Sequence, residues 1–305
     1  MKKDKINLKK VLILVIAIVL IIFIIAIIPS FSNNKTNAET NTEETNNTAE
    51  DVNSVGSASE PTAPKPFVIL NNESNKELNE STIGKLENGL PILMYHNFYD
   101  KQKGEKGPNS NWMEISDFEN QMKYLSENNY YFPSWEEVND YLDGAADLPA
   151  KSVVITIDDG DPSFFSEALP VLQEYNIIAT SFVVTSWSAD KVAEYKSSPN
   201  IRFESHSNDM HKAGSDGKGY FLTATKEQAI ADLEQTKAIL GTNIVFCYPY
   251  GDYSDFTEQI LQQEGYKIAV TTKSGRAKPG MDKLALPRVR MSKGDSLDNF
   301  ITRVK

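Results

Sequence analysis

The sequence predicts an α/β protein whose globular part is an incomplete or distorted (β/α)7-type barrel. Over residues 86–305, short apolar runs typical of strands alternate with segments of helical periodicity. We count about seven strand-like runs, and a complete barrel of this kind has eight strands. Polar residues directly follow most of these runs, as expected where parallel barrels place their chemistry. The alternation, the strand number and the polar strand ends together favour a barrel over an open, doubly wound sheet.

The expected strands are rich in β-branched residues. They cover residues 90–95, 153–157, 178–184, 201–204, 244–248, 266–271 and 286–291. The expected helices cover residues 117–128, 135–142, 162–175, 226–240 and 256–264. Two helices have start signals: Ser116 is the expected N-cap of the first, and Ser134 with Glu137 predicts a capping box for the second.

The N-terminus predicts a membrane anchor. Residues 1–10 contain five lysines and form the expected cytoplasmic segment, and residues 11–28 are an unbroken apolar run. As a helix this run would extend about 27 Å, close to the thickness of a bilayer core. The preceding lysines favour a cytoplasmic N-terminus, and so a single-pass protein of the cell membrane with an extracellular domain. A cleaved signal peptide is the alternative, and it would give a secreted protein.

Residues 29–85 are the expected disordered linker or stalk, because they are dominated by Asn, Thr, Ser, Glu and Pro and contain few large apolar side chains. The catalytic domain is expected to cover residues 86–305. The chain has a formal net charge of -11 at pH 7, which argues against nucleic-acid binding. Cys247 is the single cysteine, so the chain forms no internal disulfide.

Residues 153–160 are the most informative segment, because a β-branched run ends there in Asp158, Asp159 and a glycine. Two adjacent carboxylates at a strand end are costly unless a positive charge lies beside them. Two of the three histidines, His206 and His211, lie close together downstream. One carboxylate and two imidazoles predict a divalent-metal site with open positions. Zinc is the default ion, and cobalt, nickel or iron would fit the same ligands.

Three segments resemble, in this order, the motifs of the polysaccharide deacetylases of the NodB-homology type (carbohydrate esterase family 4). Residues 156–160, Thr-Ile-Asp-Asp-Gly, are similar to the family's Thr-Phe-Asp-Asp-Gly motif. Residues 206–211 are similar to its His-Ser/Thr-x-x-His motif, and residues 248–251 to the end of its Arg-x-Pro-Tyr motif. The resemblance covers most of residues 90–305, and the three motifs together are specific.

The resemblance implies a metal-dependent hydrolase that removes N-acetyl groups from a polysaccharide. It implies that Asp158 is the general base and that the backbone N–H of Tyr250 helps to stabilise the oxyanion. It also implies that Asp159, His206 and His211 hold the metal ion.

The spacing of the two histidines departs from the family pattern. His206 and His211 are five residues apart, whereas the family motif separates them by four. On a regular helix five residues correspond to a rotation of about 140° from one face, so the two rings would not point to one ion. The segment is therefore expected to be a loop or to contain a bulge.

Two further departures concern charged side chains. Cys247 stands where the family has an arginine, and the C-terminal part of the chain lacks the usual catalytic histidine. His96 follows the first strand, which lies beside the last strand in a closed barrel. This arrangement resembles the circularly permuted branch of poly-β-1,6-N-acetylglucosamine deacetylases. We therefore predict that His96 is the general acid and that Arg288 replaces the missing arginine and orients Asp158.

The preferred function is deacetylation of N-acetylglucosamine residues in a cell-surface polysaccharide, with poly-β-1,6-N-acetylglucosamine as the first choice. Peptidoglycan and chitin oligosaccharides are alternative substrates. A non-catalytic glycan-binding domain is the alternative class, and an iron oxygenase with a two-histidine, one-carboxylate site is a third. The presence of Asp158, Asp159, His206 and His211 disfavours the non-catalytic class, and Asp158 beside the metal ligand favours hydrolysis over oxygenation. Trp187 fits either a sugar-stacking or a packing role, and the sequence leaves the oligomeric state open.

Overall fold

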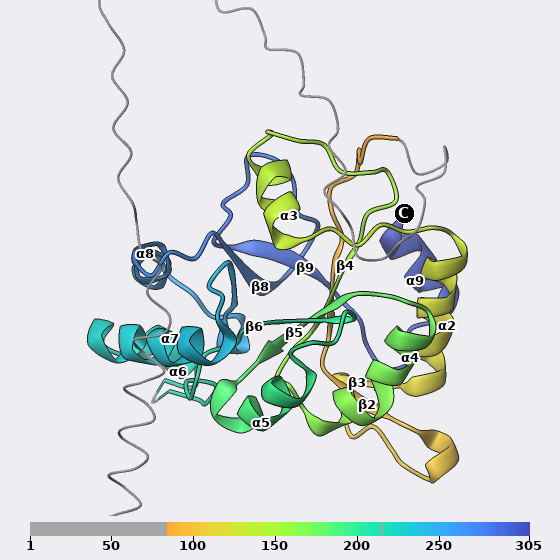
Figure 1. Ribbon diagram of the computed structural model, residues 1–305, viewed down its shortest axis with the longest axis horizontal. Coiled ribbons are helices and arrows are strands. Elements are labelled where there is room, and N and C mark those ends of the chain that lie inside the picture. Colours follow the sequence, from red (N-terminus) through yellow and green to blue (C-terminus); the bar gives the residue numbers. More distant parts are fainter. Residues whose placement is uncertain (1–83, 215) are drawn as a thin grey trace, which may run out of the picture. The chain divides into compact units, whose positions relative to one another are not determined.

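The computed structural model describes residues 84–214 and 216–305, which form a closed barrel of parallel strands (Figure 1). The strands pair in the order β1-β4-β5-β6-β7-β8-β9, and β1 also pairs with β9. The predicted seven-stranded barrel is thus confirmed. Its strands are β1 (Ile92–Tyr95), β4 (Val154–Ile157), β5 (Ala179–Val183), β6 (Ile201–Ser205), β7 (Val245–Cys247), β8 (Ile268–Ser274) and β9 (Leu286–Arg290).

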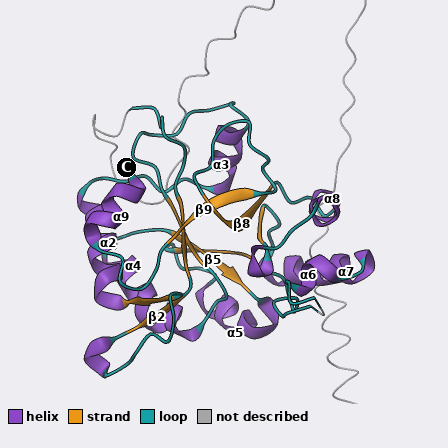
Figure 2. Cartoon of the chain, turned by 180° about the vertical axis from the view of Figure 1, so that it is seen from behind, coloured by secondary structure: helices purple, strands orange, loops and turns teal. Residues whose placement is uncertain are grey.

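Helices surround the strands (Figure 2). Helices α2, α4 and α9 pack together on one side, and α7 packs against α5 and α8. The helices are α2 (Ile115–Glu127), α3 (Trp135–Leu142), α4 (Leu169–Glu174), α5 (Thr185–Tyr195), α6 (Tyr220–Thr223), α7 (Lys226–Leu240), α8 (Asp255–Gln263) and α9 (Leu297–Val304). The predicted capping box of α3 is present.

The pleat of β4 separates the barrel interior from the helix-covered outside. Val154 belongs to an apolar cluster with Phe182 and Val270 of other strands, which is the interior of the barrel. Ile155 and Ile157 belong instead to the cluster that packs against the helices. Because side chains alternate along a strand, the residue that follows Ile157 returns to the inner side. The strand thereby directs the first carboxylate of the predicted site into the barrel.

Several elements differ from the sequence-based expectation. Helix α2 is capped by Glu114, whose carboxylate accepts the Ser116 N–H, so the prediction of Ser116 as the N-cap was wrong. The expected helix 162–175 is a π-helical turn, Phe164–Ala168, followed by α4. Helices α5 and α9 were not predicted. Neither was the small parallel pair formed by β2 (Asn97–Tyr99) and β3 (Trp112–Glu114).

The predicted cytoplasmic segment 1–10, membrane anchor 11–28 and nearly all of the linker 29–85 lie outside the described residues. Within residues 84–214 and 216–305, no helix has the length and apolar character needed to cross a bilayer.

Candidate active site

The carboxyl ends of the strands bring two groups of predicted side chains together. We call Asp158, Arg288 and Cys247 the inner pocket. Asp158 and Arg288 form a bidentate ion pair, with Oδ1–Nη1 and Oδ2–Nη2 distances of 2.7 Å each. Both residues are buried, with 2% and 1% of their surface exposed. Arg288 therefore makes the contact that its predicted role, orienting Asp158, requires.

Arg288 is fixed in this position because each of its five N–H donors has an acceptor. Besides the ion pair, Nε donates to the Thr271 carbonyl at 2.8 Å and Nη1 donates to Thr156 Oγ1 at 3.0 Å. Nη2 also donates to Cys247 Sγ at 3.3 Å. These partners come from β4, β7 and β8, so the guanidinium joins four strands of the barrel.

Two opposing effects set the protonation of Asp158. Burial alone would raise the pKa of this carboxyl, because the charged form loses its hydration. The charge and hydrogen bonds of Arg288 outweigh burial and hold the pKa well below its ordinary value. Asp158 is therefore ionised at neutral pH and is able to accept a proton.

His96 lies beside the inner pocket, directly after β1. Its Nε2 is 3.8 Å from Asp158 Oδ2, and its Nδ1 is buried without a hydrogen-bond partner among the described residues. Burial lowers the pKa of His96, and the negative charges of Asp158 and Asp159 oppose this effect. The ring is close enough to share a substrate with Asp158, and its role as the general acid stays a prediction.

We call Asp159, His206 and His211 the outer pocket. Asp159 Oδ1 lies 3.4 Å from His206 Nε2 and 3.2 Å from His211 Nε2. Ligand atoms of all three residues lie within 4.8 Å of one another. The segment 206–211 is a loop, as the five-residue spacing predicted. It brings both rings to one carboxylate, which a regular helix would not do.

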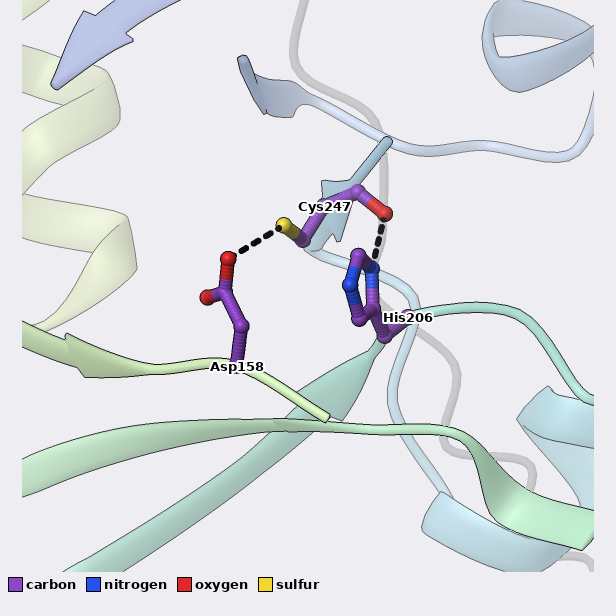
Figure 3. Close-up of side chains that lie close together, drawn as sticks. All are labelled: Asp158, His206 and Cys247. Carbon is purple, nitrogen blue, oxygen red and sulfur yellow. Dashed lines mark hydrogen bonds between the residues drawn. The ribbon is translucent and has the colours of Figure 1, made fainter. Parts of the chain in front are cut away.

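The hydrogen bonds of the outer pocket fit a divalent cation. His206 Nδ1 is 2.7 Å from the Cys247 carbonyl oxygen (Figure 3). A carbonyl only accepts, so Nδ1 carries a proton and Nε2 is the ring nitrogen that faces Asp159. Burial alone would lower the pKa of His206, but Cys247 and Asp159 outweigh burial and raise that pKa. Asp159 Oδ1 is buried without a hydrogen-bond partner among the described residues. Burial, together with the nearby His206, lowers the pKa of His211 to about 4, so its ring is neutral at pH 7.

A second group of possible ligands consists of Asp158, His206 and Cys247 (Figure 3). This group fits a cation less well than the outer pocket does. Asp158 is already paired with Arg288, and His206 presents its protonated nitrogen to the Cys247 backbone. Burial raises the pKa of the Cys247 thiol, which lies 3.6 Å from Asp158 Oδ2 and stays protonated. The thiol is therefore an uncharged group that lines the inner pocket.

A left-handed turn separates the two pockets. Asp159 and Gly160 have φ values of 75° and 71°. A Cβ at residue 160 would lie 2.7 Å from Ser188 Oγ and 2.9 Å from Val183 Cγ1, so this turn requires glycine. For Asp159 the conformation is strained, as is often found at functional sites. The turn sends Asp158 inward and Asp159 toward the histidines.

Two exposed aromatic rings flank His211. The Tyr250 ring stacks on it with 5.0 Å between the ring centroids, and the Trp187 ring meets it edge-on at 5.6 Å. Trp187 is 58% exposed and Tyr250 47% exposed, which is unusual for large apolar side chains. Trp187 comes from α5, and Tyr250 lies after β7 with a φ of 63°. The oxyanion role of the Tyr250 N–H stays a prediction.

Residues 145–269 match the family profile described as polysaccharide deacetylase. A poly-beta-1,6-N-acetyl-D-glucosamine N-deacetylase of Staphylococcus aureus is 26% identical over 205 residues, covering 62% of this chain and 70% of that protein. The same-named protein of Staphylococcus epidermidis is 25% identical over 266 residues, covering 79% of this chain and 90% of that protein.

Two solved structures are similar as well. The Streptococcus pyogenes deacetylase PplD, in complex with acetate, has a TM-score of 0.61 and 27% identity, covering 71% of this chain and 98% of that chain. IcaB from Ammonifex degensii has a TM-score of 0.61 and 26% identity, covering 72% and 97%.

The barrel, the two pockets and these similarities define the class of the protein: the chain carries a polysaccharide deacetylase domain and is a carbohydrate N-deacetylase. Among its relatives are the poly-β-1,6-N-acetylglucosamine deacetylases of the staphylococci.

Proposed function

We propose that this protein is a metal-dependent hydrolase that removes N-acetyl groups from a poly-β-1,6-N-acetylglucosamine of the cell surface. The observation that carries the proposal is the pairing of two pockets on adjacent residues. Asp158 is held ionised by Arg288, while Asp159 faces two imidazole nitrogens. A hydrolase of amides needs both a base for water and a site that polarises the carbonyl group. The names of the staphylococcal relatives support the choice of glycan.

Asp159, His206 and His211 would hold the metal ion, for which we propose zinc. The ion would supply Lewis acidity toward the acetamide carbonyl oxygen. Asp158 accepts a proton from the attacking water, and Arg288 keeps that carboxylate in place. The backbone N–H of Tyr250 donates to the oxygen that becomes negatively charged. His96 protonates the departing amine as the C–N bond breaks, so that acetate and a free glucosamine are released.

Trp187 and Tyr250 support binding of a sugar chain beside the outer pocket. Their exposed rings offer apolar faces against which a pyranose ring can pack. Because both rings contact His211, a sugar bound on them lies next to the proposed metal ligands. We propose that they hold the sugar whose acetamide group is cleaved, or its neighbour in the chain.

We further propose that residues 11–28 anchor the protein in the cell membrane with the catalytic domain outside. The basic and then apolar sequence of the first 28 residues supports this proposal. Extraction of membranes with alkaline carbonate tests it: the anchored full-length chain stays in the membrane pellet. Release into the supernatant as a shortened chain would contradict an uncleaved anchor.

Acetate release by the purified chain tests the proposed activity. The enzyme is stripped with a chelator, resupplied with zinc, cobalt or nickel, and given β-1,6-linked or β-1,4-linked N-acetylglucosamine pentamers. We expect metal-dependent release from the β-1,6 pentamer that Asp158→Asn abolishes. Faster release from the β-1,4 pentamer would contradict the proposed glycan. A chain that binds metal and releases no acetate from either pentamer would favour peptidoglycan as substrate, and one that neither binds metal nor releases acetate would favour a glycan-binding domain.

A further inference from the structure

The loop that connects His206 with His211 needs support from outside itself. Its backbone is irregular, and Ser207 has a φ of 75°. One loop N–H, that of Met210, is satisfied locally by Ser207 Oγ at 3.0 Å. The N–H groups of Asn208 and Asp209 cannot find acceptors in a regular helix or strand, and buried unpaired N–H groups are costly. Their acceptors decide where the loop, and therefore His211, is held.

Both acceptors belong to one side chain of helix α7. Asp232 Oδ1 accepts the Asn208 N–H and Asp232 Oδ2 accepts the Asp209 N–H, each at 2.7 Å. Asp232 is only 6% exposed and takes part in none of the ion pairs found among the described residues. A buried carboxylate without a cationic partner is costly. Here the two carboxylate oxygens of Asp232 accept the hydrogen bonds of the two loop N–H groups, one each.

The side chain of Asn208 adds a second connection to the same helices. Its Oδ1 accepts the Thr185 hydroxyl of α5 at 2.9 Å, and its Nδ2 donates to Gln235 Oε1 of α7, also at 2.9 Å. The hydroxyls of Thr185 and Thr236 lie 3.3 Å apart, which links α5 to α7 beneath the loop. The middle of the loop is thus fixed to a rigid helix while its two ends carry the histidines.

We propose that Asp232 is a positioning residue for the outer pocket, which sets the separation of His206 and His211 at the value that one ion can bridge. The proposal rests on the metal site of the proposed function. It explains how this chain uses a histidine spacing of five residues. The loop is one residue longer than in the family pattern, and the Asp232 carboxylate on α7 accepts the hydrogen bonds of the two N–H groups in the middle of the loop. Residues that orient metal ligands typically contribute a factor of 10–100 to metal affinity.

The test is the zinc dissociation constant of the full-length chain, measured by competition with a chromophoric chelator. Asp232→Asn keeps the size of the side chain but leaves one loop amide facing an NH2 group. We expect zinc binding to weaken 10- to 100-fold. The matched control is Glu234→Gln, an exposed residue of the same helix with the same change of charge. We expect less than a twofold effect from it.

Two further measurements separate positioning from general stability. The thermal midpoint of the metal-free protein reports folding, and the visible spectrum of bound cobalt reports ligand geometry. We expect a changed cobalt spectrum for Asp232→Asn and recovery of kcat at saturating zinc. If that variant does not fold, Asp232→Glu replaces it, because the longer side chain keeps the charge but shifts both acceptor oxygens; zinc affinity equal to that of the wild type would overturn the proposal. Asn208→Ala is measured beside either variant. This variant removes the side-chain contacts but keeps both backbone hydrogen bonds, and it should weaken zinc less than tenfold.

The outcomes are distinct. Wild-type protein that binds no zinc overturns the metal site of the proposed function. If the wild type binds zinc and Asp232→Asn binds it with equal affinity and an unchanged cobalt spectrum, the positioning role of Asp232 is wrong. The metal site of the proposed function would then still stand. A larger loss for Asn208→Ala than for Asp232→Asn assigns the support to the Asn208 side chain, which also contradicts the proposal.

Discussion

The inner and outer pockets contain adjacent aspartates whose surroundings are opposite in kind. Asp158 is sealed inside the barrel and paired with a permanent cation, so its charge is fixed. Asp159 is more exposed and faces two imidazole rings rather than a guanidinium, so both of its partners are side chains that can also bind a metal ion. A single peptide bond and a left-handed turn separate these environments. The comparison shows that position relative to the barrel wall, rather than residue type, determines what each carboxylate can do.

The largest expected effect is a separation of catalysis from metal binding. Asp158→Asn removes the proposed base and should lower kcat/KM by about 10³-fold, within the range typical of general acid–base catalysis. Its zinc content should stay near that of the wild type. Asp159→Asn should lose both activity and zinc. Acetate release and bound zinc are measured on the same preparations. Loss of zinc from Asp158→Asn would mean that the two pockets are not separate.

Removal of Arg288 tests whether the inner pocket depends on its ion pair. Arg288→Ala leaves Asp158 buried without a cation, which should lower the free energy of unfolding by about 3–5 kcal/mol. The control is Arg290→Ala, an exposed arginine of the same strand, with an expected change within about 0.5 kcal/mol. Urea unfolding measures both variants. Equal losses of stability in the two variants would show that the Asp158–Arg288 ion pair contributes nothing specific to folding stability.

The same pair has a predictable pH dependence. In the wild type the pKa of Asp158 is lowered in the folded state, so its stabilisation is complete above the ordinary value of 3.8 and is lost as the pH falls through the folded pKa. In Arg288→Ala, burial raises that pKa instead. The variant should then lose stability as the pH rises above about 4, where the unfolded chain ionises first. Urea unfolding at several pH values would show this difference: the free energy of unfolding should fall toward low pH in the wild type and should fall toward high pH in Arg288→Ala.

Glu204 sharpens the comparison with Asp158, because it is a buried carboxylate that forms no bidentate ion pair with an arginine among the described residues. The Thr242 hydroxyl lies 3.4 Å from each of its oxygens and the Val245 backbone N–H also donates to it, but burial outweighs these contacts and raises its pKa to about 8. The folded state therefore binds the proton more tightly than the unfolded chain does. Stability should decrease as the pH rises from about 4.5 to about 8, by at most about 1.4 kcal/mol per unit.

Glu204→Gln should flatten this slope relative to the wild type. The measurement is urea unfolding of both metal-free proteins at pH 5, 6.5 and 8. A slope that the substitution leaves unchanged would show that Glu204 is ionised in the folded state.

The smallest expected effect concerns Trp187. Trp187→Ala should raise KM about fivefold with kcat nearly unchanged, because stacking of this kind contributes about 1 kcal/mol and acts equally on substrate and transition state. Trp187→Phe should restore most of the affinity. Phe256→Ala, at an exposed aromatic residue of α8, is the control. A fall in kcat with an unchanged KM would assign Trp187 to the chemistry rather than to binding.

The sequence predicted those parts of the site that depend on strand ends. Asp158 and Asp159 follow an apolar run, and the parallel topology then places them beside the residues that follow other strands. The proximity of His96 and Arg288 also followed from sequence, because a closed barrel makes its first and last strands neighbours. Pairing of Leu93 with Val289 provides that closure.

The features that the sequence did not predict depend on tertiary contacts, which leave no pattern in the neighbouring residues of the chain. Asp232 occupies a helix position that reads as polar surface, and its two acceptors matter only because a distant loop folds over α7. Glu114 displaced Ser116 as the cap of α2, although Ser is a good N-cap, because the strand β3 extends to that point. Helix α5 begins directly at the end of its strand with Thr185, so no polar linker marked the change.

The closure of the barrel also sets the moment at which the inner pocket is completed. His96 and Arg288 come from opposite ends of the described domain and meet only when β9 docks between β1 and β8. Contacts of such long sequence separation form late, since the entropy of closing the longest loop must be overcome. A chain still being synthesised lacks the guanidinium that fixes Asp158. The ion pair of Asp158 with Arg288 therefore forms only with the last strand, and a chain truncated before β9 cannot make it.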